Sequence, residues 1–251
     1  MKRRKKRFIP VVPVLLLLLP VVLTACSQEE PAAAELAAIE AAYAESELDR
    51  TERDAEFAPQ YEALVDEYWG TGAALEAKLW LMGRAVRDAG EEEQAATVTE
   101  YTDAIFERYA RSPHIAKLAE MSYYYSEEQI DRYFGDLREN SPHADVRAAV
   151  IYNLAFRNKI DLTYGRVEAT PENEAAVEAE FRLLLDEYGD VPLNNTTYGV
   201  MADAFLNAHS EEELAIGRKA PEIIGRTVDG EEIRLSDFLG KVTVIDFWGD
   251  W

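Results

Sequence analysis

The sequence contains a single cysteine, Cys26, among its 251 residues. One thiol cannot close a disulfide within the chain, and it cannot supply the cysteine pair that disulfide exchange or a cysteine-rich metal site requires. Histidine is nearly as rare, with only His114, His143 and His209. The first two lie at the starts of predicted helices, where we expect them to be exposed, and none has a second ligand at metal-binding spacing. The sequence therefore predicts no metal site and no cofactor.

Basic residues are also scarce, because the chain has 26 Lys and Arg against 48 Asp and Glu, a formal net charge of −22. Six of the basic residues and none of the acidic ones lie in residues 1–25, so the remainder carries 20 basic against 48 acidic residues, or −28. This balance argues against nucleic acid as a partner and against electrostatic docking on anionic lipid. It is typical of a soluble body with a solvated acidic surface.

Residues 1–25 combine a basic start, MKRRKKR, with the apolar run FIPVVPVLLLLLPVVL. This pattern is typical of a secretory signal peptide. Pro10, Pro13 and Pro20 interrupt the apolar run, which makes it a poor permanent membrane helix but an acceptable export signal. We therefore predict a lipoprotein signal peptide over residues 1–25.

The signal peptide is followed by Cys26 in the sequence Leu-Thr-Ala-Cys, which resembles the bacterial lipobox. The resemblance implies cleavage before Cys26 and lipid attachment to it, and several acyl chains on one residue anchor a protein stably. A lone buried cysteine after an ordinary signal peptide is the alternative. We expect a lipid-anchored protein of the bacterial cell envelope that faces the periplasm, and Ser27, in place of Asp, favours the outer membrane. Residues 26–34 are predicted to form a flexible lipidated tether.

Residues 35–214 are predicted to form an α-helical, repeat-like domain. Apolar residues recur there at three- and four-residue spacing, with acidic residues between them. Pro59 is expected to divide the first long stretch into two helices, the second of which ends near Gly70. Ser126 and Gln129 have the spacing of a capping box at the start of a further helix.

A short repeat in this region indicates helical hairpins. The tripeptide Ser-Pro-His occurs at Ser112 and again 29 residues later at Ser141. Each serine is predicted to be an N-cap, with Pro113 or Pro142 at the first helical position, where the missing N–H costs nothing. The period is close to that of tetratricopeptide-like hairpins, although their consensus is not cleanly matched.

Three consecutive tyrosines, Tyr123, Tyr124 and Tyr125, allow two interpretations. They could line a binding groove, or they could fill the gaps between packed helices with their hydroxyls at the rim. We favour packing, since that is the commoner use of such residues in a helical stack.

The pattern changes in residues 215–251, where two alternating apolar runs replace the helical spacing. Asp229 and Gly230 form a hairpin turn dipeptide between two predicted short strands. Ser236 is expected to cap a single helical turn. Residues 242–248, VTVIDFW, are apolar at nearly every position, as in a central strand buried on both faces.

This last segment resembles the start of a redoxin domain of the thioredoxin superfamily, as in the membrane-anchored thiol–disulfide reductases of the TlpA/ResA kind and their AhpC/TSA-type relatives. The resemblance covers only about the last 35 residues, and within them the motif is dense and ordered. The matching positions are Gly217, Ala220, Pro221, Asp229, Gly230, Leu235, Ser236, Asp237, Gly240, Lys241, Phe247, Trp248 and Trp251.

In that family a Cys-x-x-Cys pair directly follows the tryptophan that matches Trp251, and the first cysteine is a thiolate at a helix N-terminus. The resemblance implies that Trp248 and Trp251 neighbour an active site whose catalytic residues, expected directly after Trp251, are absent from this chain. We therefore expect the 251-residue chain to be inactive and its redoxin domain to be truncated. Three explanations compete for the truncation, namely an incomplete gene, a nonsense mutation and a UGA codon for selenocysteine read as stop, and we hypothesise the third.

The expected fold is mainly α, with a tetratricopeptide-like helical-hairpin domain followed by the N-terminal fragment of an α/β thioredoxin-like domain. The leading functional prediction is a membrane-anchored thiol–disulfide oxidoreductase whose intact form acts on protein thiols or disulfides or on peroxide. The alternative is a helical protein-binding scaffold with a vestigial redoxin segment. A solute-binding lipoprotein is disfavoured, because the helical region lacks an alternating strand–helix pattern.

Overall fold

The computed structural model describes residues 19–208 and 213–246, with side chains from Gln28 onward. Helices dominate these residues, so the predicted mainly α class is confirmed. The chain divides into two compact units, Met1–Leu206 and Asn207–Trp251, here named unit 1 and unit 2. Within the described residues, no helix is both long and apolar enough to cross a lipid bilayer. Most of the predicted signal peptide lies outside those residues.

Unit 1 begins with three helices, α1 (Leu19–Glu45), α2 (Arg50–Tyr68) and α3 (Gly72–Asp88). The predicted break at Pro59 is wrong, since Pro59 lies inside α2 and the chain turns before that helix instead. The boundary between α1 and α2 is marked by Asp49 and not by Pro59. The Asp49 carboxylate accepts a hydrogen bond from Glu52 N at 3.0 Å and caps α2. Burial of Phe57 and Ala58 beside the proline offsets the one helical hydrogen bond that it removes.

The predicted flexible tether at residues 26–34 is also corrected, because α1 runs through all of them. Ala32 is fully buried and Leu36 nearly so. The run PAAAELAA after Glu30 is rich in alanine, the strongest helix former. Packing of α1 on α2 and α3 then fixes this segment on the body of the unit.

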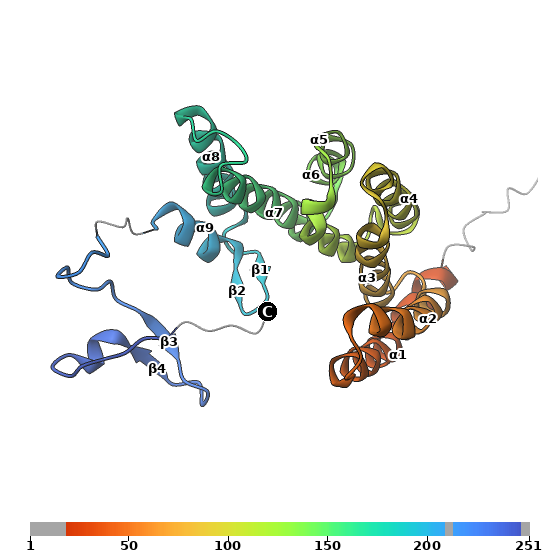
Figure 1. Cartoon of the computed structure of the whole chain (residues 1–251), viewed down its shortest axis with the longest axis horizontal. Helices are drawn as coiled ribbons and strands as arrows, with labels where there is room; N and C mark the ends of the chain where they lie inside the picture. Colours follow the sequence, from red (N-terminus) through yellow and green to blue (C-terminus); the bar gives the residue numbers. More distant parts are fainter. Residues whose placement is uncertain (1–18, 209–212, 247–251) are drawn as a thin grey trace, which may run out of the picture. The chain divides into compact units, whose positions relative to one another are not determined.

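The remainder of unit 1 is a row of helices, each packed on its neighbours along the chain (Figure 1). A two-stranded hairpin precedes the last helix, and its strands pair through Leu193 and Thr196. The elements are α4 (Glu91–Tyr109), the 3₁₀ helix η1 (Pro113–Tyr124), α5 (Glu127–Gln129), the π-helical η2 (Ile130–Phe134), α6 (Gly135–Asn140), α7 (Ala144–Thr163), α8 (Pro171–Tyr188), β1 (Pro192–Leu193), β2 (Thr196–Thr197) and α9 (Tyr198–Leu206).

Two of the predicted helix starts are confirmed in detail. Ser112 accepts a hydrogen bond from His114 N and begins η1. Ser126 and Gln129 form the reciprocal capping box, with distances of 2.9 and 3.3 Å. Ser141 repeats the local bond by accepting from His143 N at 3.3 Å, but α7 starts only at Ala144, so the N-cap predicted at Ser141 is displaced.

Two clusters of buried side chains form the core of unit 1, and α3 contributes to both. On one face, Ala73, Ala74 and Ala77 allow α1 and α2 to pack closely. On the other face, Leu75 and Met82 join a larger cluster that extends to α9. Helix α3 thereby fixes the first two helices to the rest of the unit.

Unit 2 contains a short antiparallel ribbon and one helical turn, namely β3 (Ile224–Arg226), β4 (Glu232–Arg234) and η3 (Leu235–Phe238). Gly225 pairs with Ile233, which confirms the predicted hairpin. The strand predicted at residues 242–248 is wrong as far as Asp246, because residues 242–246 pair with no strand and their side chains are exposed. An apolar run needs a neighbouring strand to satisfy its backbone, and none of the described strands pairs with residues 242–246.

Candidate functional site

The motif residues of unit 2 lie on and around the ribbon, whose tip is held by hydrogen bonds. Thr227 N donates to Glu231 O at 2.8 Å, and Gly230 N donates to Thr227 O at 2.9 Å. Arg226 Nη1 also donates to Gly230 O at 2.9 Å. Gly230 has a φ of +85°, which glycine adopts without strain. The Asp229-Gly230 pair therefore shapes the turn and has no direct chemical role here.

Glu222 and Ser236 join the two ends of the ribbon. Ser236 N donates to Glu222 Oε1 at 2.9 Å. Hydrogen bonds from the Ser236 side chain and backbone lower the pKa of the Glu222 carboxyl, which favours its ionised form. The predicted capping role of Ser236 is wrong, because Asp237 Oδ2 instead accepts from Arg234 N at 3.0 Å. Ser236 lies inside η3.

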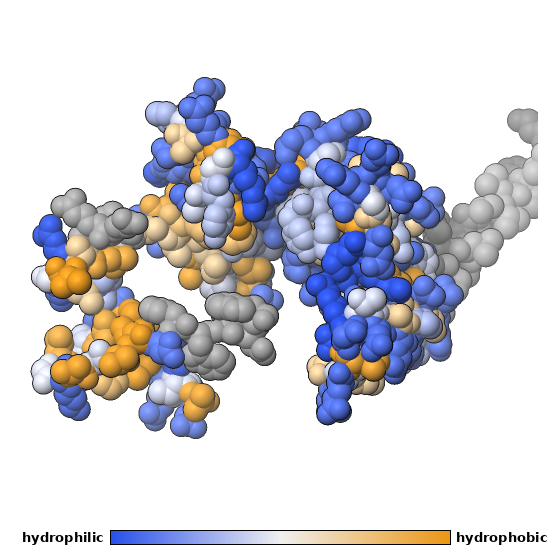
Figure 2. Space-filling model, viewed as in Figure 1, coloured by the Kyte–Doolittle hydropathy of each residue, from blue (hydrophilic) through white to orange (hydrophobic). Residues whose placement is uncertain are grey.

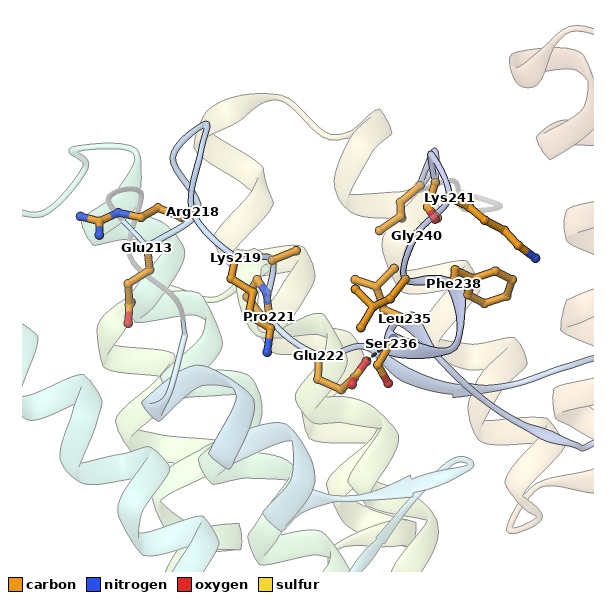
Figure 3. A pocket seen from close by; sticks show the side chains of 14 residues that line it. Glu213, Arg218, Lys219, Pro221, Glu222, Leu235, Ser236, Phe238, Gly240 and Lys241 are labelled. Carbon is orange, nitrogen blue, oxygen red and sulfur yellow. Dashed lines mark hydrogen bonds between the residues drawn. The ribbon is translucent and has the colours of Figure 1, made fainter.

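A hollow of about 790 Å³ lies between the segment before β3 and the segment after η3, with Glu222 and Ser236 at its edge (Figure 3). Lys219 and Lys241 supply positive charge to its lining. Its apolar lining consists of Ala220, Pro221, Leu235, Phe238, Leu239 and Ile245. This arrangement offers an apolar floor with charged edges.

The apolar side chains of unit 2 are open to solvent. Among its described residues none is buried, and Leu239 is 77% exposed. Ile223, Ile224 and Val228 are exposed as well, and apolar residues gather on the surface around β3 and β4 (Figure 2). A contiguous apolar surface of this kind favours packing against further protein.

The residues predicted to surround a redox site are only partly placed by the structure. Phe247, Trp248 and Trp251 lie outside the described residues, as does the side chain of Cys26. Because Cys26 is the one cysteine of the sequence, no thiol lines the hollow. The hollow therefore contains no group able to exchange with a disulfide.

The two described histidines of unit 1 form more contacts than the sequence predicted. His114 Nε2 lies 3.0 Å from Glu29 Oε1. His143 Nε2 lies 3.0 Å from the backbone oxygen of Arg111. Both rings are half-buried, whereas His209 lies outside the described residues. In the part of the chain that the structure describes, no group of three or more His, Cys, Asp or Glu side chains could hold a metal ion.

The three consecutive tyrosines have different environments. Tyr125 is buried, and its hydroxyl lies 2.7 Å from Thr102 Oγ1. Tyr124 is half-buried, while Tyr123 is 63% exposed. Tyr124 packs against the same core cluster, so the packing interpretation is confirmed for Tyr124 and Tyr125 but not for Tyr123.

A partly buried polar network around Asp54 in unit 1 was not predicted. Tyr43 donates to Asp54 Oδ1 at 2.5 Å, and Arg87 Nη2 donates to Asp54 Oδ2 at 3.0 Å. Burial alone would raise the pKa of the Asp54 carboxyl, but the hydrogen bonds from Tyr43 and Arg87 outweigh it and lower the pKa. The three residues come from three helices, so no local sequence pattern connects them.

Unit 1 also carries a groove of about 450 Å³ between η1, α7 and the β1–β2 hairpin. Amide and aromatic side chains line it together with one cation and one anion. Its lining includes Lys117, Glu120, Tyr152, Asn153, Asn194, Asn195 and Tyr198. Apolar side chains of Ala116, Ala149, Leu193 and Met201 complete the lining, so the groove offers both hydrogen-bonding groups for an extended peptide backbone and apolar contacts for its side chains.

Comparison with known proteins bears on only a small part of the chain. Over 41 residues it is 42% identical to the thiol-disulfide oxidoreductases ResA of Bacillus thuringiensis subsp. konkukian and Bacillus cereus strain ATCC 10987. The ResA protein of Bacillus anthracis is 37% identical over a match of the same length. Each match covers 16% of this chain and 24% of the relative, so the chain spans about a quarter of the relatives' length. No family model and no solved structure matches.

Proposed function

We propose that the chain belongs to a lipid-anchored thiol–disulfide oxidoreductase of the bacterial envelope, in which unit 2 opens the thioredoxin-like redox domain. The 42% identity to ResA proteins over 41 residues is the observation that carries this proposal. The matched length is close to that of unit 2, where the motif residues lie. The paired ribbon and its Gly230 turn support it, because they have the form that the motif predicts. Unit 1 is then an added, tetratricopeptide-like helical domain.

The proposed reaction is disulfide exchange. A thiolate, or the selenolate of a selenocysteine, attacks one sulfur of a substrate disulfide and releases the other sulfur as a thiolate. A second thiol then attacks the mixed disulfide, which frees the reduced substrate and leaves the enzyme oxidised. Both reacting groups lie beyond Trp251 in this proposal, since Cys26 carries lipid. The substrate class of this exchange is a protein disulfide; with a peroxide, the same nucleophile would instead attack one oxygen, break the O–O bond and release water or an alcohol.

The nucleotides after the codon for Trp251 test the proposal. We expect a Cys codon, or a UGA read as selenocysteine, followed in frame by the rest of a redoxin domain. The product of that extended frame should reduce a protein disulfide such as that of insulin. Serine at the first reacting position and the 251-residue chain should both be inactive. A UAA or UAG codon at that place in several independent isolates would contradict the proposal.

The lipid anchor has a separate test. Mass spectrometry of the N-terminal peptide from bacterial membranes should show an acylated Cys26, and the protein should partition into detergent. Cys26→Ser should remove both properties. Acylation without redox activity would support the lipid anchor and contradict the oxidoreductase. Redox activity without acylation would support the oxidoreductase and contradict the lipid anchor.

A helical protein-binding scaffold remains the second candidate. The groove beside η1 and α7 favours it, because its amide and charged side chains could bind an extended peptide. A clean stop after Trp251 in independent isolates, combined with specific peptide binding by the 251-residue chain, would favour this function over the first.

A further inference from the structure

The body of unit 1 begins almost immediately after Cys26. Glu29, only three residues later in α1, accepts hydrogen bonds from the Gly72 backbone N–H at 3.3 and 3.2 Å. Its Oε1 also lies 3.0 Å from His114 Nε2. One carboxylate thus binds both the N-terminal end of α3 and the start of η1, where backbone N–H groups favour negative charge.

The next turns of α1 are fixed as well. Ala32 is fully buried, and Leu36 and Ile39 belong to the same core cluster. Because α1 is continuous from Leu19 to Glu45 and a helix rises 1.5 Å per residue, Cys26 lies only about 4.5 Å along the axis from Glu29. A flexible tether of the predicted length is therefore absent.

We propose that the lipidated protein holds one end of unit 1 directly against the bilayer, with the lipid surface as its partner. This inference rests on the proposed lipid attachment to Cys26. The end in question, here named the anchor end, consists of Glu29, the α2–α3 turn, the last turn of α4 and the start of η1. Tyr109 connects these elements, since its hydroxyl accepts from Gly70 N at 2.8 Å and donates to Thr71 O at 2.9 Å.

Geometry, and not charge, maintains this placement. The chain after residue 25 carries a net charge of −28, so the whole body is repelled by anionic lipid. At the anchor end, the exposed Arg108 and Arg111 offset Glu107 and Glu30 locally. The contact should therefore persist when added salt screens surface charges.

The opposite end of unit 1 provides an internal reference. Helix α3 starts at the anchor end with Gly72 and ends at Asp88, 17 residues in all, which corresponds to about 25 Å. Asp88 is exposed at that far end, where it forms an ion pair with Arg84. Glu107, in the last turn of α4, is an exposed acidic residue at the anchor end.

The test uses the acylated 251-residue chain in phosphatidylcholine vesicles that contain lipid with a nitroxide on the headgroup. Since acylation occupies Cys26, Glu107→Cys and Asp88→Cys each introduce a single reactive thiol for a fluorophore. We expect strong quenching at position 107 and little at position 88, at low and at high salt. Adding Glu29→Ala should reduce the difference, whereas Glu30→Ala, the matched control, should not.

The outcomes separate this inference from the function on which it rests. Equal quenching at both positions in acylated protein would overturn the direct placement and leave the anchor intact. A non-acylated Cys26 would overturn the anchor and the placement together. An unchanged difference in Glu29→Ala would remove the role of the Glu29 contacts.

Discussion

Unit 1 and unit 2 differ in what holds them together. Unit 1 has two clusters of buried side chains that share α3, and residues such as Tyr109 and Phe134 are almost fully enclosed. Unit 2 has no buried residue among those described, yet its ribbon and helical turn still form. Local turn chemistry therefore suffices to shape unit 2, whereas unit 1 depends on contacts between distant residues.

Removing an aromatic ring from the core of unit 1 should produce the largest difference in stability between the two units. Phe134 is fully buried against Tyr125, with ring centroids 4.9 Å apart. We expect Phe134→Ala to destabilise unit 1 by about 3–5 kcal/mol, because it creates a cavity. The matched change in unit 2, Leu239→Ala, removes an exposed side chain and should alter the unfolding free energy by less than about 0.5 kcal/mol. Urea unfolding followed by helical circular dichroism measures the stability of unit 1 in both variants, and amide exchange in β3 and β4 measures that of unit 2. An equal loss of stability from the two substitutions would refute the difference between the units.

The Asp54 network should give the next largest effect. Asp54→Asn leaves the Arg87 guanidinium without its charged partner, and we expect a loss of about 2 kcal/mol. Because the folded pKa of Asp54 lies below its ordinary value, the stabilisation is fully present above that ordinary value. It is lost as pH falls through the folded pKa.

The stability difference between wild type and Asp54→Asn should therefore be constant near neutral pH and shrink below about pH 4. Thermal unfolding across that range measures it. Asp88→Asn is the matched control, because Asp88 forms an exposed pair with Arg84 and should change stability little at any pH. A difference that grows in acid would contradict the assigned direction of the pKa change.

The features that the sequence predicted correctly are those set by neighbouring residues. The capping box at Ser126, the N-cap at Ser112 and the hairpin at Gly230 each depend on a few consecutive positions. The errors arise where distant contacts decide. Burial of Ala32 converts an expected tether into a helix, and burial around Pro59 keeps a proline within α2.

For the candidate site too, local features were predicted from the sequence and contacts between distant residues were not. The motif around the ribbon was recognisable because turns and glycines are local signals, and the chain indeed shares 42% identity with ResA proteins over 41 residues. The contact of Glu29 with His114 and the Asp54 network were missed. Each joins residues from separate helices, and no periodic pattern encodes such a pair.

A smaller effect is expected from one buried hydroxyl. Thr102 Oγ1 donates to Val98 O, so the Tyr125 hydroxyl donates to Thr102 at 2.7 Å. Tyr125→Phe removes that bond without removing the ring and should cost about 1 kcal/mol. Tyr123→Phe, at a largely exposed position of the same tyrosine run, should be neutral. Equal effects in thermal unfolding would show that the three tyrosines are equivalent, contrary to their environments.

The smallest effect on global unfolding should come from the ribbon of unit 2. Gly230→Ala forces alanine to a φ of +85° and should weaken the turn by about 1 kcal/mol. Gly225→Ala is the matched control, because its backbone is not left-handed and the nearest atom to an added Cβ is 3.9 Å away. Amide exchange should become faster in β3 and β4 in the first variant alone, with the unfolding of unit 1 unchanged in both. Since the ribbon has no buried core to compensate, its order depends on this turn, and unchanged exchange in Gly230→Ala would mean that contacts elsewhere hold it.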